Sequence, residues 1–339
     1  MNDANHGLWP PRQSKLLGLG HYLPRRVVTN EELFRTVGVS PEEIRRRTGV
    51  EERRFIEPGE SCSELAYRAV VNMLQKSGVR MEDIDCIVFA TLSPDHFFPG
   101  SGCFLQEKLG LVGIPALDIR GQCSGFLYGL AIADSFVRLG TYQRVLVVGS
   151  EIHSTGLNFG AAGRDLSILF GDGAACAILG PSDGDSAVLA TRLHADGRYA
   201  RELWVESPSS SAREQISHAD IDRGAHYPHM NGGLVFRQGI RRLQEVIRET
   251  VSGICALDDI SLFVFHQANI RIIQMVVKRM GIPSGRVFNT ISRYGNTTAA
   301  SIPISLSEAI DQGRLQRGDL LMLASFGAGF TWGGVLIRY

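Results

Sequence analysis

Two amphipathic segments, each followed by a short apolar run, stand out in the pattern of hydrophobic and polar positions. Apolar residues recur at helical spacing over residues 63–79, and residues 81–93 then predict a loop and a buried strand. The same order returns later, where residues 236–257 predict a helix and residues 258–269 predict a loop and a strand. One unit of helix and strand is therefore expected twice in the chain.

A second pair of segments repeats at nearly the same separation. Residues 140–151 predict a turn and a strand, and residues 313–327 show the same pattern, each after a helix rich in small and apolar residues. Helix-then-strand patterns also recur by chance in α/β proteins, but two matches at one separation favour a duplication. We expect two similar halves, residues 14–180 and 181–339, after a flexible N-terminal arm of residues 1–13.

The alternation of strands and helices predicts mostly parallel sheets with helices packed on them. The strand RVLVVGS, residues 144–150, is apolar at consecutive positions, as expected when helices cover both faces of a sheet. Equivalent strand ends of two related halves should lie near each other. We therefore expect Cys123, His266 and the segment NTTAAS (296–301) to meet in one site.

Composition and charge narrow the class of protein. The 35 basic and 35 acidic side chains give no general attraction to nucleic acid or to a membrane surface. Six dispersed cysteines form no C-x-x-C pair, which argues against zinc and against a disulfide framework. No apolar run is typical of a signal peptide or long enough to span a membrane. We expect a cytoplasmic protein with reduced cysteines and no metal site.

Three polar residues stand at these predicted strand ends. Cys123 opens the predicted helix 123–139, where the helix N-terminus favours a nucleophilic thiolate, although buried inert cysteines are common. His266 follows a core strand and could cap the next helix, and Asn296 could equally be a turn or N-cap residue. Together they supply a nucleophile, a base or donor, and an amide donor. The small residues of GAGFTWGG (327–334) could bring a backbone N–H to a reacting carbonyl and form an oxyanion hole.

At these residues the chain resembles β-ketoacyl-ACP synthase III, in the thiolase-like superfamily of condensing enzymes. The matching motifs follow the family's order and span nearly the whole chain: GLGHYLP (18–24), RRRTGVEERR (45–54), FPGSGCFLQEKLGL (98–111), CSGF (123–126), LFGDGA (169–174), HQANIRI (266–272), YGNTTAAS (294–301) and SFGAGFTWG (325–333).

The resemblance implies a duplicated thiolase-like fold, layered αβαβα, with two mixed, mostly parallel sheets. It implies a decarboxylative Claisen condensation, in which an acyl-CoA or acyl-ACP loads Cys123 and malonyl-ACP supplies the carbanion. His266 and Asn296 resemble the pair that donates hydrogen bonds to the malonyl thioester carbonyl. The N–H groups of Cys123 and Ala328 resemble the oxyanion hole. No cofactor is implied, since CoA and phosphopantetheine thioesters are substrates.

Further residues resemble the family's binding surfaces. Contacts to the CoA or phosphopantetheine arm are expected from Arg47, Arg164, Asn269 and Arg271. Docking of the acidic acyl carrier protein is expected on Arg237, Arg271, Lys278 and Arg279. Phe98 resembles a residue that crosses a dimer interface to wall the partner's acyl pocket. The expected partners are therefore acyl carrier protein, acyl-CoA and a second copy of the chain, without nucleic acid or membrane.

The chain departs from the family at a few positions. Glu43 stands where some relatives carry a tryptophan that stacks on adenine, which allows an ACP-bound acyl donor. Gln122 precedes the nucleophile where a small residue is common. The long polar segment 206–230 is expected to be a surface loop over the tunnel mouth, with His226 and His229 solvated rather than metal-binding.

The same residues are also compatible with other reactions. Relatives of this fold also transfer acyl groups to hydroxyls or amines, or condense two acyl chains head to head. Cysteine, histidine and asparagine in this chain order also occur in papain-type cysteine hydrolases, although their C-G-S-C-W signature is absent here.

Overall fold

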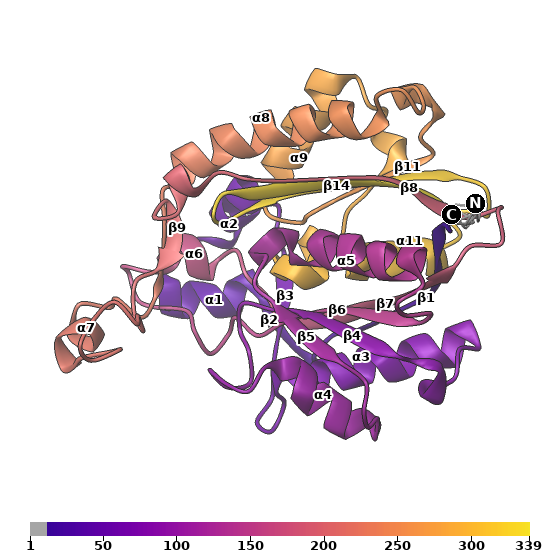
Figure 1. The fold of residues 1–339 in the computed structure, drawn as a ribbon. Coiled ribbons are helices and arrows are strands. Elements are labelled where there is room, and N and C mark those ends of the chain that lie inside the picture. The colour runs from indigo at the N-terminus through magenta and orange to yellow at the C-terminus, as the bar shows by residue number, and fades with distance from the viewer. Residues whose placement is uncertain (1–11) are drawn as a thin grey trace, which may run out of the picture.

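Two five-stranded sheets form the centre of the protein in a computed structural model, which describes residues 12–339 (Figure 1). The first sheet contains, in spatial order, β1 (Ser14–Tyr22), β7 (Gly173–Pro181), β6 (Val145–Glu151), β4 (Cys86–Ala90) and β5 (Ala116–Ile119). The second contains β8 (Ala187–Ala195), β14 (Thr331–Arg338), β13 (Leu320–Gly327), β11 (Leu262–Phe265) and β12 (Val287–Phe288).

Both sheets have the same topology. The strands β6, β4 and β5 pair in parallel, whereas β7 pairs antiparallel with both β6 and β1, so β7 alone among the five runs against the others. In the second sheet β12, β11 and β13 pair in parallel, and β14 is the reversed strand, which pairs antiparallel with both β13 and β8. The mixed, mostly parallel sheets and the internal duplication predicted from the sequence are therefore confirmed.

Helices fill three layers around the sheets (Figure 1). The helices α3 (Cys62–Ser77) and α4 (Ser101–Leu109) cover the outer face of the first sheet. Between the sheets lie α5 (Gly125–Leu139) and α11 (Ser301–Asp311). The outer face of the second sheet carries α8 (Gly232–Val251) and α9 (Ile270–Met280). This is the five-layer αβαβα arrangement that the resemblance implied.

Local sequence explains where these helices begin and how they pack. At the start of α3, the Ser61 hydroxyl accepts a hydrogen bond from the Glu64 N–H, as an N-cap residue does. In α5, which is covered on both faces, Gly129 lies so close to Val147 that an added Cβ would be 2.7 Å from its Cγ1. The small residues predicted in the central helices therefore let two sheets pack on them.

Shorter elements complete the described chain: β2 (Arg26–Thr29), α1 (Asn30–Val37), α2 (Pro41–Thr48), β3 (Glu52–Phe55), α6 (Arg164–Ser167), β9 (Leu203–Val205), α7 (His218–Asp222), β10 (Pro228–Met230) and α10 (Ile291–Tyr294). The expected N-terminal arm, residues 1–13, lies outside the described residues except for its last two positions. Within residues 12–339, every helix is too short or too polar to cross a membrane.

Candidate active site

Cys123 lies in a tight turn between β5 and α5. The chain forms one 3-10 turn over Gln122–Ser124 before α5 begins at Gly125, two residues later than the predicted helix start. The turn closes through a hydrogen bond from the Ser124 N–H to the Gly121 carbonyl, 3.0 Å long. Gln122 has φ of 43°, a left-handed conformation that side chains other than glycine rarely adopt. The nucleophile candidate is thus held on a strained turn, and its side chain is 7% exposed.

The second half of the fold holds this turn in place. Ser325 of β13 donates its hydroxyl proton to the Cys123 carbonyl, 2.8 Å away. The last residue of β13, Gly327, packs directly on the nucleophile, and a Cβ on Gly327 would lie 2.5 Å from the Cys123 Cβ. Only glycine lets the strand end approach so closely. The expected meeting of the two halves at Cys123 is therefore observed.

The electrostatic environment of the thiol differs from the expectation. Burial raises the pKa of Cys123 to about 12, and the nearby Glu151 carboxylate also raises it. Hydrogen bonds from the backbone N–H groups of Ala328 and Cys123 lower this pKa, but less than burial raises it. The resting group is therefore a thiol, and the predicted thiolate is wrong for the resting site because desolvation outweighs the helix terminus. The two N–H groups expected in the oxyanion hole do lie at the sulfur.

His266 follows β11 and is almost fully buried. Its Nδ1 lies 2.7 Å from the hydroxyl of Ser301, which also accepts a hydrogen bond from the Gln267 N–H. Burial lowers the pKa of His266 to about 3, and the nearby His153 lowers it further, so the imidazole is neutral. Its Nε2 is buried and has no hydrogen-bond partner within residues 12–339. Such an atom is rare in folded proteins and points to a missing ligand.

Asn296 is fixed by its backbone on both sides. Its N–H donates to the Leu169 carbonyl at 2.8 Å, and its carbonyl accepts from the Gly171 N–H at 3.1 Å. The side-chain Oδ1 accepts a hydrogen bond from the Thr298 N–H at 2.9 Å. This contact orients the amide and leaves its NH₂ group as a donor without a partner in the described part of the chain.

A cavity of about 760 Å³ lies beside Cys123, within the range of small-ligand pockets. Its wall comes from both halves and includes Cys62, Leu92, Arg120, Gln122, His153, Phe170, Leu203, Trp204, His226, Thr298, Ala328 and Gly329. From the segment 206–230, which was expected to lie over the tunnel mouth, His226 and Pro228 line this cavity. The prediction that His226 is solvated is wrong, because its Nδ1 is buried; His229 is exposed.

Glu151 and His153, at the carboxyl end of β6, are site residues that the sequence interpretation missed. The Glu151 carboxylate is fully buried and accepts hydrogen bonds from the Ser93 hydroxyl at 2.7 Å and the Leu92 N–H at 3.1 Å. Burial raises the pKa of Glu151 to about 7. Two titratable residues directly after the apolar strand VLVVGS were the available signal.

Two of the four predicted substrate-arm residues touch each other. The Asn269 side chain donates to the Arg47 carbonyl at 3.0 Å. The Arg47 guanidinium pairs with Asp165 at 2.7 Å and with Glu43 at 3.4 Å. Asp165 and Glu43 raise the pKa of Arg47, with the Asp165 hydrogen bond as the largest cause. Arg164 is exposed at the start of α6.

The predicted docking residues lie on α8 and α9, which pack against each other (Figure 1). Arg237, Arg271, Lys278 and Arg279 are all exposed. The Arg271 guanidinium lies over the ring of Phe236, 5.5 Å from its centroid. None of these four cations forms an ion pair within the described part of the chain.

Phe97 and Phe98 form an exposed apolar tip. Their side chains are 62% and 80% exposed, and the two rings touch edge to face. Neither belongs to the wall of the cavity in its own chain. Two adjacent exposed aromatic residues are costly to leave in water, which is typical of a contact surface.

A buried thiol, a neutral histidine and an oriented asparagine, placed at strand ends of a duplicated fold, define a thiolase-like condensing enzyme. Family models of 3-oxoacyl-[acyl-carrier-protein (ACP)] synthase III match residues 117–197, and the model of its C-terminal part matches residues 254–339.

Relatives extend this match over nearly the full chain. The β-ketoacyl-[acyl-carrier-protein] synthase III of Xanthomonas campestris is 41% identical over 328 residues, covering 96% of this chain and 98% of that protein. The enzyme of Alkalilimnicola ehrlichii is 42% identical over 329 residues, covering 96% and 99%. A crystal structure of the Aquifex aeolicus enzyme has a TM-score of 0.88 at 38% identity, covering 96% and 100%. The chain therefore belongs to the β-ketoacyl-[acyl-carrier-protein] synthase III family.

Proposed function

We propose that this chain condenses an acyl thioester with malonyl-ACP through an acyl intermediate on Cys123. The relatives are named for β-ketoacyl-ACP synthesis, and the site offers the groups that both half-reactions need. The product is a β-ketoacyl-ACP two carbons longer than the acyl group that enters. We place this reaction in fatty acid biosynthesis, as the family's function.

In the first half-reaction, the Cys123 sulfur attacks the thioester carbonyl of the acyl donor. A carbon–sulfur bond to Cys123 forms, the bond to the carrier sulfur breaks, and the thiol proton leaves with the carrier thiol. The N–H groups of Cys123 and Ala328 stabilise the negative oxygen of the tetrahedral intermediate. Because burial raises the pKa of Cys123, proton removal accompanies attack rather than preceding it.

In the second half-reaction, malonyl-ACP loses carbon dioxide. The electrons of the broken carbon–carboxylate bond form an enolate, whose carbon attacks the acyl carbonyl. The bond to sulfur breaks, and Cys123 leaves as a thiolate that takes up a proton from water. His266 and Asn296 donate hydrogen bonds to the enolate oxygen. Ser301 can donate its proton to the His266 Nδ1, which leaves the Nε2 proton free for the substrate.

One observation supports the second step above all others, namely the buried Nε2 of His266 without a protein partner. A structural histidine in a core would have this nitrogen bonded. A neutral donor also suits the step, because it stabilises developing negative charge without giving up its proton to the carboxylate. The Asn296 NH₂ group supplies a second donor of the same kind.

The two half-reactions can be separated by mutation. His266→Ala and Asn296→Ala should still take an acyl group onto Cys123 but lose carbon dioxide release from malonyl-ACP by roughly 10²–10³-fold. His229→Ala makes the same chemical change at an exposed histidine outside the cavity and should leave both steps unchanged. The roles are contradicted if both site variants lose acylation and keep decarboxylation.

Partners follow from the exposed surfaces. We propose that Arg237, Arg271, Lys278 and Arg279 dock the acidic carrier protein, because they are exposed and form no ion pair within the described chain. We propose that Arg47, Arg164, Asn269 and Arg271 contact the substrate arm, and that the exposed Phe98 completes the acyl pocket of a second copy in a homodimer. A cytoplasmic location fits these carriers.

A further inference from the structure

His153 is a buried histidine in the wall of the cavity beside Cys123. It follows β6 by two residues, its side chain is 7% exposed, and it lines the same cavity as Cys123 and Thr298. Its backbone N–H donates to the Asp172 carboxylate at 2.7 Å, and its ring packs on Phe170 with centroids 4.6 Å apart. The ring is therefore held in one place, as a recognition residue needs to be.

One ring nitrogen of His153 has no hydrogen-bond partner among residues 12–339. The Nε2 lies 3.2 Å from the Thr298 hydroxyl, and the ring makes no other hydrogen bond to residues 12–339. Burial lowers the pKa of His153 to about 3, so the ring is neutral and carries one donor and one acceptor nitrogen. Nδ1 is therefore free to bind a molecule in the cavity, and leaving it unbonded beside a hydrocarbon chain is unfavourable.

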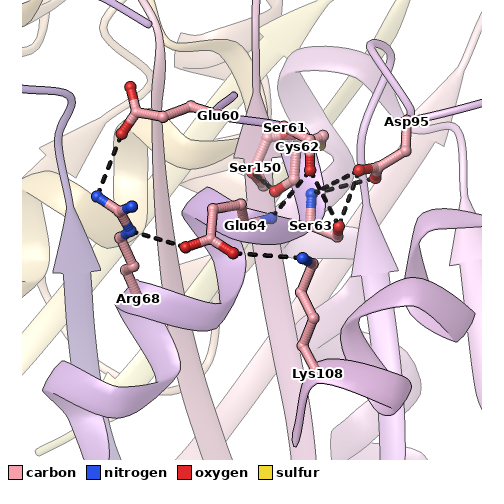
Figure 2. A network of polar contacts seen from close by, with 9 residues as sticks. All are labelled: Glu60, Ser61, Cys62, Ser63, Glu64, Arg68, Asp95, Lys108 and Ser150. Atoms are coloured by element: carbon pink, nitrogen blue, oxygen red, sulfur yellow. Dashed lines mark hydrogen bonds and ion pairs between the residues drawn. The ribbon is translucent and has the colours of Figure 1, made fainter. Parts of the chain in front are cut away.

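Several polar groups beside this cavity bond to one another, whereas the Nδ1 of His226, in the same wall, is buried without a hydrogen-bond partner among residues 12–339. Figure 2 shows that the Asp95 carboxylate receives the Ser63 N–H and hydroxyl, at 3.1 Å and 2.8 Å, and that Glu60 pairs with Arg68. The Cys62 thiol donates to the Ser150 carbonyl at 3.3 Å. These groups need no ligand, which leaves His153 and His226 among the polar groups of the wall that a bound molecule could satisfy. Of the two, His153 is the one whose position Asp172 and Phe170 fix beside Cys123 and Thr298.

We propose that the acyl group loaded onto Cys123 carries a hydroxyl group, which His153 binds. This inference rests on the proposed acylation of Cys123 and specifies the substrate class. A hydroxyl can donate to Nδ1 or accept from it, so it pairs with the histidine whichever way the Thr298 hydrogen bond is oriented. A plain hydrocarbon chain offers neither bond.

The test compares matched acyl chains by intact-protein mass. The donors are octanoyl thioesters and a set of hydroxyoctanoyl thioesters, each with one hydroxyl at a single carbon from 3 to 8. They are presented on CoA and on acyl carrier protein, and they compete for Cys123. The wild type should load at least one hydroxyacyl chain about tenfold faster than octanoate, the effect of one hydrogen bond of about 1.4 kcal/mol. His153→Leu, which keeps the bulk and removes the nitrogens, should lose this preference and load octanoate as well as or better than the wild type. His153→Gln should keep part of the preference.

His229→Leu is the matched control, because it makes the same chemical change at an exposed histidine outside the lining of the cavity. It should keep the wild-type preference. Equal loading of all chains by the wild type, or an unchanged preference in His153→Leu, would overturn the proposal while leaving condensation at Cys123 intact. Absence of acylation from every donor would overturn the proposed function as well. If His153→Leu does not fold, the wild-type preference alone decides.

Discussion

Gly327→Ala perturbs the nucleophile without changing any reacting atom. An alanine Cβ at this position would lie 2.5 Å from the Cys123 Cβ and 3.0 Å from its sulfur. Ordinary contacts begin near 3.4 Å, so the end of β13 and the nucleophile turn must separate by about 1 Å. The surrounding core is rigid, and such overpacking costs about 1–3 kcal/mol of stability.

The catalytic effect should exceed the loss of stability. A misplacement of about 1 Å at a reacting group can lower a rate on the order of 10²-fold. The same shift moves the Ala328 N–H relative to the sulfur, because Ala328 directly follows Gly327 in the chain. We therefore expect acylation of Cys123 to slow about 10²-fold in a variant that remains folded at the assay temperature.

The assay is the rate of acyl-Cys123 formation, followed by intact mass, together with the melting temperature. Gly285→Ala is the matched control, because an added Cβ at Gly285 would meet nothing within 4 Å and its φ is not positive. The control should keep the wild-type rate. A wild-type rate in Gly327→Ala would refute the close packing of β13 on the nucleophile.

Three further predictions concern charge and assembly. Glu151→Gln removes a negative charge that raises the pKa of Cys123, so alkylation of this thiol by iodoacetamide should begin at lower pH. An unchanged pH profile would contradict the electrostatic effect of Glu151 on Cys123. The difference should be largest above about pH 7, where Glu151 is ionised in the wild type. Reversal of both Lys278 and Arg279 to Glu should raise the KM for malonyl-ACP at low salt and scarcely change loading from acyl-CoA. The reason is that docking charges act on association and are screened by salt. Equal losses on both substrates would argue against carrier docking at these residues. Sedimentation should show a dimer at micromolar concentration and weaker association in Phe98→Ala, whereas a wild-type monomer would remove Phe98 from the pocket.

The architecture could be predicted because its signals are local. Helical spacing located α3 and α8, and apolar runs located β4 and β11, so the duplication followed from comparing these segments. The helix after residue 236 ends at Val251 rather than at the predicted position 257, because Gly253 with φ of 73° follows and leaves the helical conformation. Strand ends then pointed to Cys123 and His266, which the fold places in buried positions at the meeting of its halves.

The ionisation states and the extra site residues depend on contacts that are distant in sequence. The thiolate was expected from a helix terminus, but the degree of burial, which raises the pKa of Cys123, is set by the second half of the fold. His153 meets Thr298 only after folding brings β6 beside the segment that follows Asn296. Glu151 likewise finds its hydrogen-bond donors after β4. A single sequence contains no direct signal for these contacts.

The claim that Cys123 carries the acyl group captured by malonyl-ACP is tested most directly by a two-stage mass measurement. In the first stage, an accepted acyl donor should add one acyl mass to the wild type, on Cys123 after digestion, and none to Cys123→Ala. In the second stage, malonyl-ACP should return the protein to its unmodified mass and yield carbon dioxide and a β-ketoacyl-ACP two carbons longer than the donor chain. Acyl mass on another cysteine, or an acyl-Cys123 that malonyl-ACP leaves in place, would contradict the claim.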